Sequence, residues 1–192
     1  MEEVLSVCVG LGLAAACGFR VFVPLLGVSI AAMAGQIELS QGTQWMGTWP
    51  ALLCFFTATA LEIGGYYVPW IDNLLDSIAT PAAVVAGTMA TGAVIEEMSP
   101  MLRWSLALIA GGGVAGMILS ATVGARGTSS LTTAGLGNFF VSTFELVMAI
   151  ATTILAFVMP LLAVLLVALM AGIALRIVMS RRPSKRLPAT AS

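Results

Sequence analysis

Apolar runs of about 18 residues or more fill most of this chain, and they restrict it to a helical membrane fold. Only 9% of the 192 residues are charged, whereas 59% are hydrophobic, and the mean hydropathy is +1.05. An apolar stretch of that length spans a bilayer when it is helical, because every backbone polar group is then satisfied internally. The sequence therefore predicts an all-α integral membrane protein, with a transmembrane domain over residues 1–180 and a basic cytoplasmic tail over 181–192.

Interruptions of the apolar pattern predict about six transmembrane helices, with five as the alternative. The expected spans are 4–33, 50–67, 72–95, 101–124 and two within 139–179, separated by a turn near Pro160. As one helix, 139–179 would be about 60 Å long, roughly twice the hydrocarbon thickness, and the five-span alternative keeps it as one bent helix. Two spans are expected to contain broken helices, at Gly18-Phe19-Arg20 in the first and at Thr80-Pro81 in the third.

Basic residues are concentrated at the C-terminus, which fixes the expected orientation. Five of the eight Lys and Arg residues are found there: Arg176, Arg181, Arg182, Lys185 and Arg186. Behind a long apolar helix, such a cluster indicates a cytoplasmic anchor rather than a nucleic-acid site. With six spans, both termini would be cytoplasmic, and the expected partner of the chain is the lipid bilayer.

The residue types that are missing exclude several kinds of chemistry. The chain has no histidine, which removes imidazole metal sites, Ser-His and Cys-His nucleophile pairs, and histidine proton relays. Its three cysteines lie in apolar segments, and no pattern indicates a disulfide framework. No cofactor is predicted.

Several charged residues lie inside or close against the apolar stretches: Arg20, Glu62, Asp72, Asp76 and Glu145. A charge at bilayer depth costs a few kcal/mol or more, so such residues usually face a protein interior or a hydrated pathway. This pattern indicates transport, channel or lipid-handling work, and it does not indicate a substrate.

Glu62 and Arg20 each have a functional and a structural interpretation. Glu62 lies about twelve residues into its expected span, where it could exchange a proton or could be satisfied by a helix hydroxyl or by Arg20. Arg20 either pairs with Glu62 or Glu145 or attracts an anionic group. The two interpretations of Arg20 are compatible if a substrate or a proton breaks the pair.

The densest polar cluster is Asp72-Asn73-Leu74-Leu75-Asp76. The two carboxylates are four residues apart, so they share one helix face and could hold a cation, although one such pair is weak evidence for a metal. Asp72 is also a natural helix N-cap, whereas Asp76 lies one turn deeper, where capping does not explain it. Thr80-Pro81 would free backbone carbonyls that could also coordinate an ion.

Two glycine-rich stretches have different interpretations. Residues 127–138 form either a re-entrant binding segment that opens onto a helix N-terminus at Asn138, or an ordinary loop whose helix Asn138 caps. Gly112 and Gly116 have the small-residue spacing that favours close packing of two helices.

An internal repeat is suggested by two pairs of similar segments. Residues 55–62 resemble 139–145, and Gly18-Phe19-Arg20 resembles Gly124-Ala125-Arg126, in the same order. Units of three spans would have opposite topology, an architecture that recurs in transporters. The matches are short and their spacings differ, so chance similarity is the competing explanation.

The chain resembles a known family of membrane proteins. The segments that carry the resemblance are Gly18-Phe19-Arg20-Val21-Phe22-Val23-Pro24-Leu25, Pro69-Trp70-Ile71-Asp72-Asn73-Leu74-Leu75-Asp76, Ile78-Ala79-Thr80-Pro81-Ala82 and Gly135-Leu136-Gly137-Asn138. They are similar to the bacterial proteins grouped as domain of unknown function 4126, over nearly the whole chain to about residue 175, although Phe139 stands where proline is expected. The resemblance implies a bacterial inner membrane, and no catalytic residue is implied, because the family carries no established activity.

These observations favour a small inner-membrane transporter or channel for an ion or small solute, working alone or as a homo-oligomer. Glu62, Asp76 and Glu145 would be its proton or cation groups, and Arg20 their counter-charge. One alternative is a Mg²⁺-dependent membrane enzyme acting on lipid phosphates, with Asp72 and Asp76 as ligands. The other is a non-catalytic scaffold or assembly protein, so an enzyme is not the first expectation.

Overall fold

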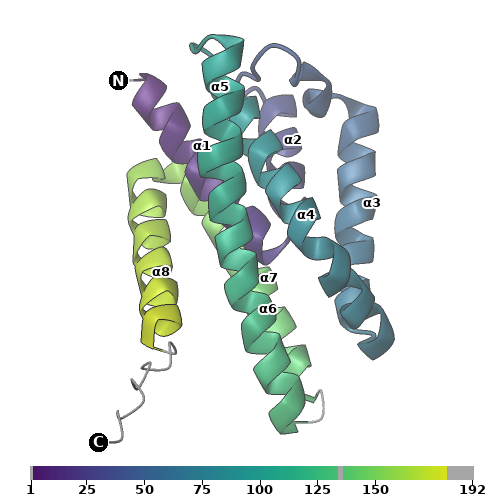
Figure 1. Cartoon of the computed structure of the whole chain (residues 1–192). Helices are drawn as coiled ribbons and strands as arrows, with labels where there is room; N and C mark the ends of the chain where they lie inside the picture. The colour runs from purple at the N-terminus through teal and green to yellow at the C-terminus, as the bar shows by residue number, and fades with distance from the viewer. Residues whose placement is uncertain (1, 134–135, 181–192) are drawn as a thin grey trace, which may run out of the picture.

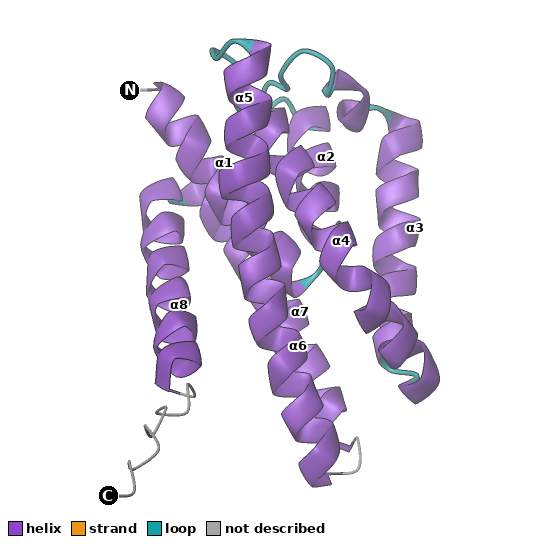
Figure 2. Cartoon of the chain, viewed as in Figure 1, coloured by secondary structure: helices purple, strands orange, loops and turns teal. Residues whose placement is uncertain are grey.

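A computed structural model describes residues 2–133 and 136–180, without the side chains of 69–70, 72–73, 125, 128–133, 136, 171, 173–175 and 177–180. Within these ranges the chain is almost entirely helical and has no strand (Figure 2). The expected tail at 181–192 lies outside the described residues. The prediction of an all-α architecture is confirmed.

The helices follow one another with short connections (Figure 1). They are α1 (Glu2–Phe19), α2 (Phe22–Met33), a 3₁₀ turn η1 (Gln44–Gly47), α3 (Trp49–Tyr66), α4 (Pro69–Val94), α5 (Pro100–Leu106), a π-helical segment η2 (Ala107–Gly112), α6 (Gly113–Thr133), α7 (Leu136–Val158) and α8 (Pro160–Ser180). Four described stretches are long and apolar enough to cross a membrane: Glu2–Phe19, Leu74–Val94, Pro100–Gly124 and Gly137–Val158. Their length and composition are those of a membrane protein.

The helix α1 lies at the centre of the bundle and packs against α4, α6, α7 and α8. Its residues 12–19 are all buried, and they include two glycines and three alanines. Small side chains allow neighbouring backbones to approach closely, which is how helices associate when lipid removes the hydrophobic driving force. A Cβ atom added at Gly18, for example, would lie 2.5 Å from the Ile118 Cβ.

The first expected span, 4–33, forms a helical hairpin instead of a single crossing. The helix breaks after Phe19 as predicted, but α2 then returns towards the end of the bundle at which α1 begins (Figure 1). At that end the Ser29 hydroxyl donates to the Met46 carbonyl, and the Ser40 N–H donates to the carbonyl of Ala93 near the end of α4. The prediction that 4–33 crosses as one span is therefore wrong.

The helix α4 runs without interruption through Pro81, so the predicted break at Thr80-Pro81 is not observed. Pro81 and Thr80 both lie on the exposed side of the helix. The opposite side carries buried alanines at helical spacing, at 79, 83, 86 and 90, which belong to the same core cluster as α1 residues. This packing holds α4 together although proline removes one backbone donor.

Glycines bring α4 and the η2–α6 helix into direct contact, as the sequence predicts. Gly112 and Gly116 both face Val84 of α4, but the closest approach involves Gly111. A Cβ atom there would lie 2.7 Å from the Gly87 carbonyl oxygen, and one at Gly87 would lie 2.9 Å from that of Gly111. At these positions only hydrogen fits in the place of a side chain.

The second half of the chain differs from the prediction at one connection and agrees at another. Most of 127–138 is helical, because α6 continues to Thr133 and α7 begins at Leu136, so this stretch is not an open loop. The apolar stretch 139–179 divides at Met159 into two helices, close to the predicted turn at Pro160. The start of α1 and the end of α8 lie at opposite ends of the bundle (Figure 1), whereas the predicted six spans would place these two helix ends on one side.

Candidate functional site

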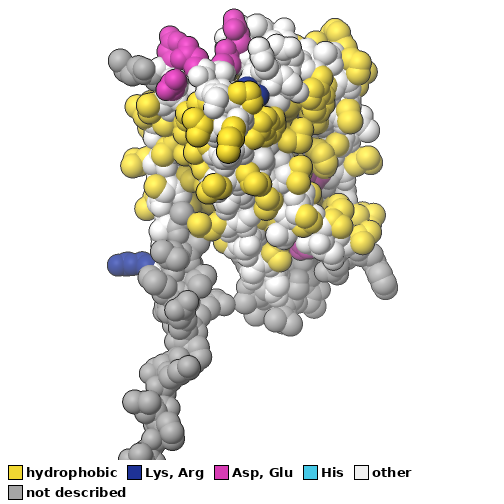
Figure 3. All heavy atoms as spheres, turned by 45° about the horizontal axis from the view of Figure 1, so that its top comes forward, with side chains coloured by type: hydrophobic (Ala, Val, Ile, Leu, Met, Phe, Trp, Pro, Cys, Tyr) yellow, Lys and Arg dark blue, Asp and Glu magenta, His cyan; other side chains and the backbone are white. Residues whose placement is uncertain are grey.

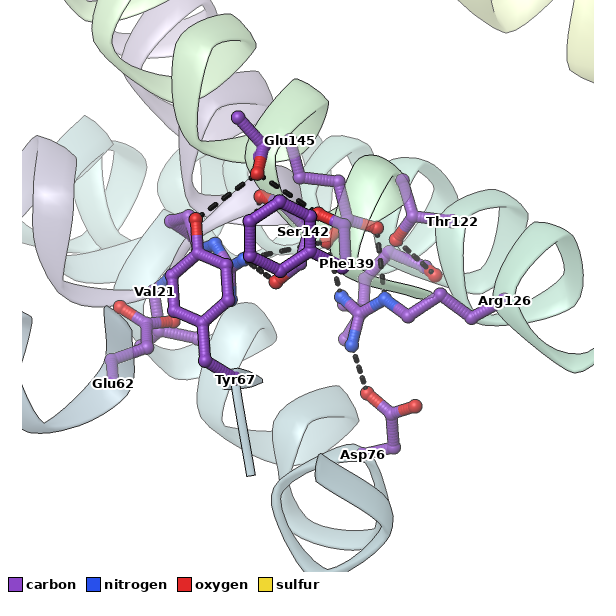
Figure 4. A network of polar contacts seen from close by, with 12 residues as sticks. Val21, Glu62, Tyr67, Asp76, Thr122, Arg126, Phe139, Ser142 and Glu145 are labelled. Atoms are coloured by element: carbon purple, nitrogen blue, oxygen red, sulfur yellow. Dashed lines mark hydrogen bonds and ion pairs between the residues drawn. The ribbon is translucent and has the colours of Figure 1, made fainter. Parts of the chain in front are cut away.

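Side chains from four helices and from the break between α1 and α2 meet in one buried cluster (Figure 4). We call it the charged cluster, and its members are Arg20, Glu62, Tyr66, Asp76, Arg126, Ser142 and Glu145. It lies where α1 ends, near the end of α3 and within α4, α6 and α7. Glu62 is 13 residues after Trp49, so along the helix it lies about 20 Å below the start of α3.

Glu145 and Arg126 form the most complete ion pair of the charged cluster. The Arg126 Nε and Nη2 atoms donate to the two carboxylate oxygens of Glu145 at 2.9 and 2.6 Å. Arg126 Nη1 donates to Oδ1 of Asp76 at 2.5 Å. Arg126 and Glu145 are 2% and 1% exposed, whereas Asp76 is 20% exposed. One guanidinium thus binds two carboxylates, and it holds Glu145 in the bidentate geometry that gives strong charge-assisted hydrogen bonds.

Arg20 is bound less completely, although it is only 1% exposed. Its Nη2 atom donates to the carbonyl of Ser142 at 2.8 Å and to the Ser142 hydroxyl at 2.5 Å. The same atom lies 3.8 Å from Oε2 of Glu145, which Arg126 already holds more tightly. The Arg20 Nε and Nη1 atoms are buried and have no hydrogen-bond partner.

Tyr66 connects the two arginines. The guanidinium carbon of Arg20 lies 4.0 Å from the centre of its ring, and that of Arg126 lies 4.3 Å from it. Cations are attracted to aromatic rings at this distance. The next residue, Tyr67, ties the end of α3 to α7 through a hydrogen bond of 3.1 Å with the hydroxyl of Thr143. Tyr66 thus holds two like charges beside each other at the end of α3.

Glu62 holds the beginning of α2. Its Oε1 atom accepts the N–H of Val21 at 2.7 Å, and its Oε2 atom accepts the N–H of Phe22 at 3.0 Å. The first N–H groups of a helix have no partner within the helix, and a carboxylate there also interacts favourably with the helix dipole. The sequence left open whether Glu62 is satisfied by a hydroxyl or by Arg20, and the structure shows a third arrangement, which lets α2 start afresh inside the bundle.

An apolar cavity of about 590 Å³ lies between α3 and α4, next to the start of α2. Glu62 and Tyr66 line it on the buried side, and Val21 lines it beside them. Its exposed lining includes Leu61 and Ile78, whose side chains reach the outer surface of the bundle. The cavity therefore joins the charged cluster to the apolar surroundings of the protein.

A family model described as a domain of unknown function (DUF4126) matches residues 7–180. The chain belongs to this family. No curated protein and no solved structure matches it. The roles of the residues in this DUF4126 protein therefore have to be argued from its own geometry.

The remaining predicted site residues of this DUF4126 protein lie apart from these contacts or outside the description. The side chains of Asp72 and Asn73 are not among those described, so the predicted cation pair of Asp72 with Asp76 stays a prediction. Thr80 faces outwards, and Asn138 is half-buried within the first turn of α7 instead of capping it from outside. The described residues contain no group of three or more Cys, Asp or Glu side chains that could hold a metal ion.

Sequence reasoning missed Arg126, Tyr66 and Ser142 as site residues. Arg126 lies beyond the expected end of its span, and the short repeat that matched it with Arg20 was the one signal pointing to it. Tyrosine is typical of membrane interfaces and serine is common in apolar helices, so neither Tyr66 nor Ser142 indicated a site. The ion pairs of the charged cluster join helices that are far apart in the chain, and no local spacing of residues encodes such contacts.

Proposed function

We propose that this protein is a small transporter of the inner membrane, for an ion or small charged solute, and that Glu62 couples proton uptake to a movement of the α1–α2 break. The observation that carries this proposal is the double role of Glu62. Its carboxylate lines the apolar cavity and at the same time holds the N–H groups of Val21 and Phe22. A change in its charge therefore acts on a helix end inside the bundle.

Proton uptake weakens this contact for two reasons. The neutral carboxyl loses its charge attraction for the helix dipole, and its O–H oxygen is a weaker acceptor for a backbone N–H than a carboxylate oxygen is. Arg20 and Arg126 lie within electrostatic reach of Glu62, as does the Cys17 thiol from α1, and the Tyr66 ring contacts both arginines. Protonation leaves the two arginines with less negative charge beside them, which shifts the balance between closed and open arrangements.

The arrangement of the helices supports a specific topology. We place the start of α1 outside the cell and the end of α8, with Arg176, in the cytoplasm, in keeping with the positive-inside rule. Exposed carboxylates gather at the opposite end (Figure 3), at Glu2, Glu3, Glu38, Glu96 and Glu97. The α1–α2 hairpin is then re-entrant, and α3, α4, α5–α6, α7 and α8 are five spans instead of six.

The inverted repeat remains a proposal, which the residues of the charged cluster support and the helix geometry does not. Arg20, Glu62, Arg126 and Glu145, which carry the matched motifs, all meet in the charged cluster. The helix breaks after the first motif, at Arg20, whereas α6 continues through Arg126. The two halves share residue types at the site more than they share helix geometry.

Flux through liposomes that contain the purified protein tests the function. The panel of probes is monovalent and divalent cations, chloride and protons, measured at several pH values in wild type, Glu62→Gln and Asp76→Asn. We expect flux that depends on pH in wild type and loses this dependence in Glu62→Gln, because glutamine cannot change its charge. Glu97→Gln is the matched control, since Glu97 is exposed in the loop after α4.

Two results would contradict the proposal. One is pH-dependent flux in Glu62→Gln equal to that of wild type, which would remove Glu62 from the mechanism. The other is the absence of flux for every probe while all variants elute as folded protein, which would favour a scaffold. The alternative of a Mg²⁺-dependent enzyme gains nothing from Asp76, because its carboxylate is already held by Arg126.

A further inference from the structure

Arg20 has an unusual shortage of hydrogen-bond partners for a buried charge. A guanidinium carries five N–H groups, and its Nη2 atom uses two of them on Ser142. The other three, on Nε and Nη1, are buried and unpaired. Leaving charged donors unpaired away from water costs several kcal/mol. Glu145 approaches only the Nη2 atom, at 3.8 Å, so an acceptor for Nε and Nη1 would have to come from elsewhere.

The apolar cavity is lined by two neighbours of Arg20, although Arg20 itself is not among its lining residues. The Tyr66 ring, which lines the cavity, is stacked against the guanidinium at 4.0 Å, and Val21, the next residue in the chain, also lines it. The exposed apolar side chains at the other side of the cavity, such as Leu61 and Ile78, face the acyl chains of the surrounding bilayer. A ligand can therefore enter from the membrane without crossing water.

We propose that this cavity and Arg20 together form a binding site for an anionic amphiphile with one apolar chain, of the long-chain carboxylate class. The chain lies in the cavity, and the carboxylate reaches past the Tyr66 ring to the unpaired N–H groups of Arg20. A volume of about 590 Å³ is within the range of small-ligand pockets, about 300–1,000 Å³, and suits one chain. The inference rests on the proposed function and names the substrate class of that site.

The neighbouring carboxylate gives the site its proton dependence. Glu62 lines the same cavity, so its negative charge opposes an arriving anion. Proton uptake by Glu62 removes that charge and leaves Arg20, Arg126 and Tyr66 around the head group, with Glu145 and Asp76 held by Arg126. The carboxylate and one proton are therefore bound together, and more tightly at lower pH as long as the head group stays ionised.

Binding is tested with two probes that differ only in head-group charge. Stearic acid with a nitroxide near its chain end, and the methyl ester of the same probe, are added to the protein in phosphatidylcholine nanodiscs. The immobilised fraction is read from electron spin resonance spectra. We expect the acid to bind about tenfold more tightly than the ester, because charge-assisted hydrogen bonds contribute about 1.5–3 kcal/mol.

Two glycines provide a matched pair of variants for the cavity. Gly64 lines it, and a Cβ atom added there meets nothing within 4 Å, so Gly64→Leu adds a bulky side chain to the cavity wall without a clash at its Cβ. Gly113 is also exposed with nothing within 4 Å of its Cβ position, but it lies at the start of α6. We expect Gly64→Leu to lose at least about tenfold in binding of both probes, and Gly113→Leu to bind as wild type does.

Arg20→Lys tests the head group. Lysine keeps the charge but not the planar set of donors, so the preference for the acid over the ester should fall while ester binding is kept. Equal binding of acid and ester by wild type would overturn the proposal and would mean that water satisfies Arg20. So would unchanged binding in Gly64→Leu. Stearate binding without flux of any solute would refute transport alone, and flux without a preference for the acid would refute the substrate class alone.

Discussion

Replacing Glu145 by glutamine tests whether the charged cluster holds the bundle together. The substitution keeps the shape and removes the charge that accepts two hydrogen bonds from Arg126. It also removes the carboxylate that lies 3.8 Å from Arg20, whose Nε and Nη1 are already unpaired. Breaking a buried ion pair by removing one partner costs about 3–5 kcal/mol. Asp76 still holds Arg126, so we expect the lower part of this range, about 3 kcal/mol.

The free energy of unfolding is measured by titrating detergent-solubilised protein with sodium dodecyl sulfate and following helix content by circular dichroism. Thr152→Val is the control on the same helix, because the Thr152 hydroxyl is buried with no hydrogen-bond partner. Valine has nearly the same shape, so this variant should be as stable as wild type or more stable. A loss below about 1 kcal/mol in Glu145→Gln would show that the ion pairs contribute no net stability, and the argument would fail.

Two further predictions concern regions away from the charged cluster. Gly111→Ala should destabilise the protein by about 1–3 kcal/mol, because the new Cβ has no room beside Gly87. Gly113→Ala has open space and should stabilise by up to about 1 kcal/mol in the same unfolding assay; equal effects of the two would refute the packing argument. Partial burial, and then Glu38, Glu97 and Glu2, raise the pKa of Glu96 above its ordinary value. Folded protein therefore holds that proton more tightly than unfolded protein and loses stability as the pH rises through the raised pKa. Glu96→Gln should raise the melting temperature at pH 7 and leave it unchanged at about pH 4, and a gain that persists at the lower pH would contradict this cause.

The sequence determines the helical content and several boundaries because these depend on local chemistry. The break after Phe19, the division near Pro160 and the close packing of the Gly111–Gly116 region were all predictable from glycine and proline positions. The return of α2 was not predictable, since a helix break gives no direction to the segment that follows. That direction depends on Glu62, 41 positions after Val21 in the chain.

The candidate site was predictable in its residue types and not in its pairings. Charges within apolar sequence must find partners, so Arg20, Glu62, Asp76 and Glu145 were all expected to lie inside the protein. The sequence offered Glu62 and Glu145 equally as partners of Arg20, and Glu145 is the nearer carboxylate at 3.8 Å. Arg126 was overlooked because its apolar run had already ended, although it donates three hydrogen bonds to the carboxylates of the cluster.

The helix break explains why Arg20 lacks acceptors. A helix that begins inside the bundle presents unpaired N–H groups, and Glu62 satisfies those of Val21 and Phe22 with both of its oxygens. Glu62 is therefore unavailable to Arg20, although it lies within electrostatic reach. Glu145 is bound bidentately by Arg126, so it too has little left to offer. The hairpin thus leaves the Nε and Nη1 atoms of Arg20 without an acceptor, and it is this shortage on which the proposed binding of an anionic amphiphile rests.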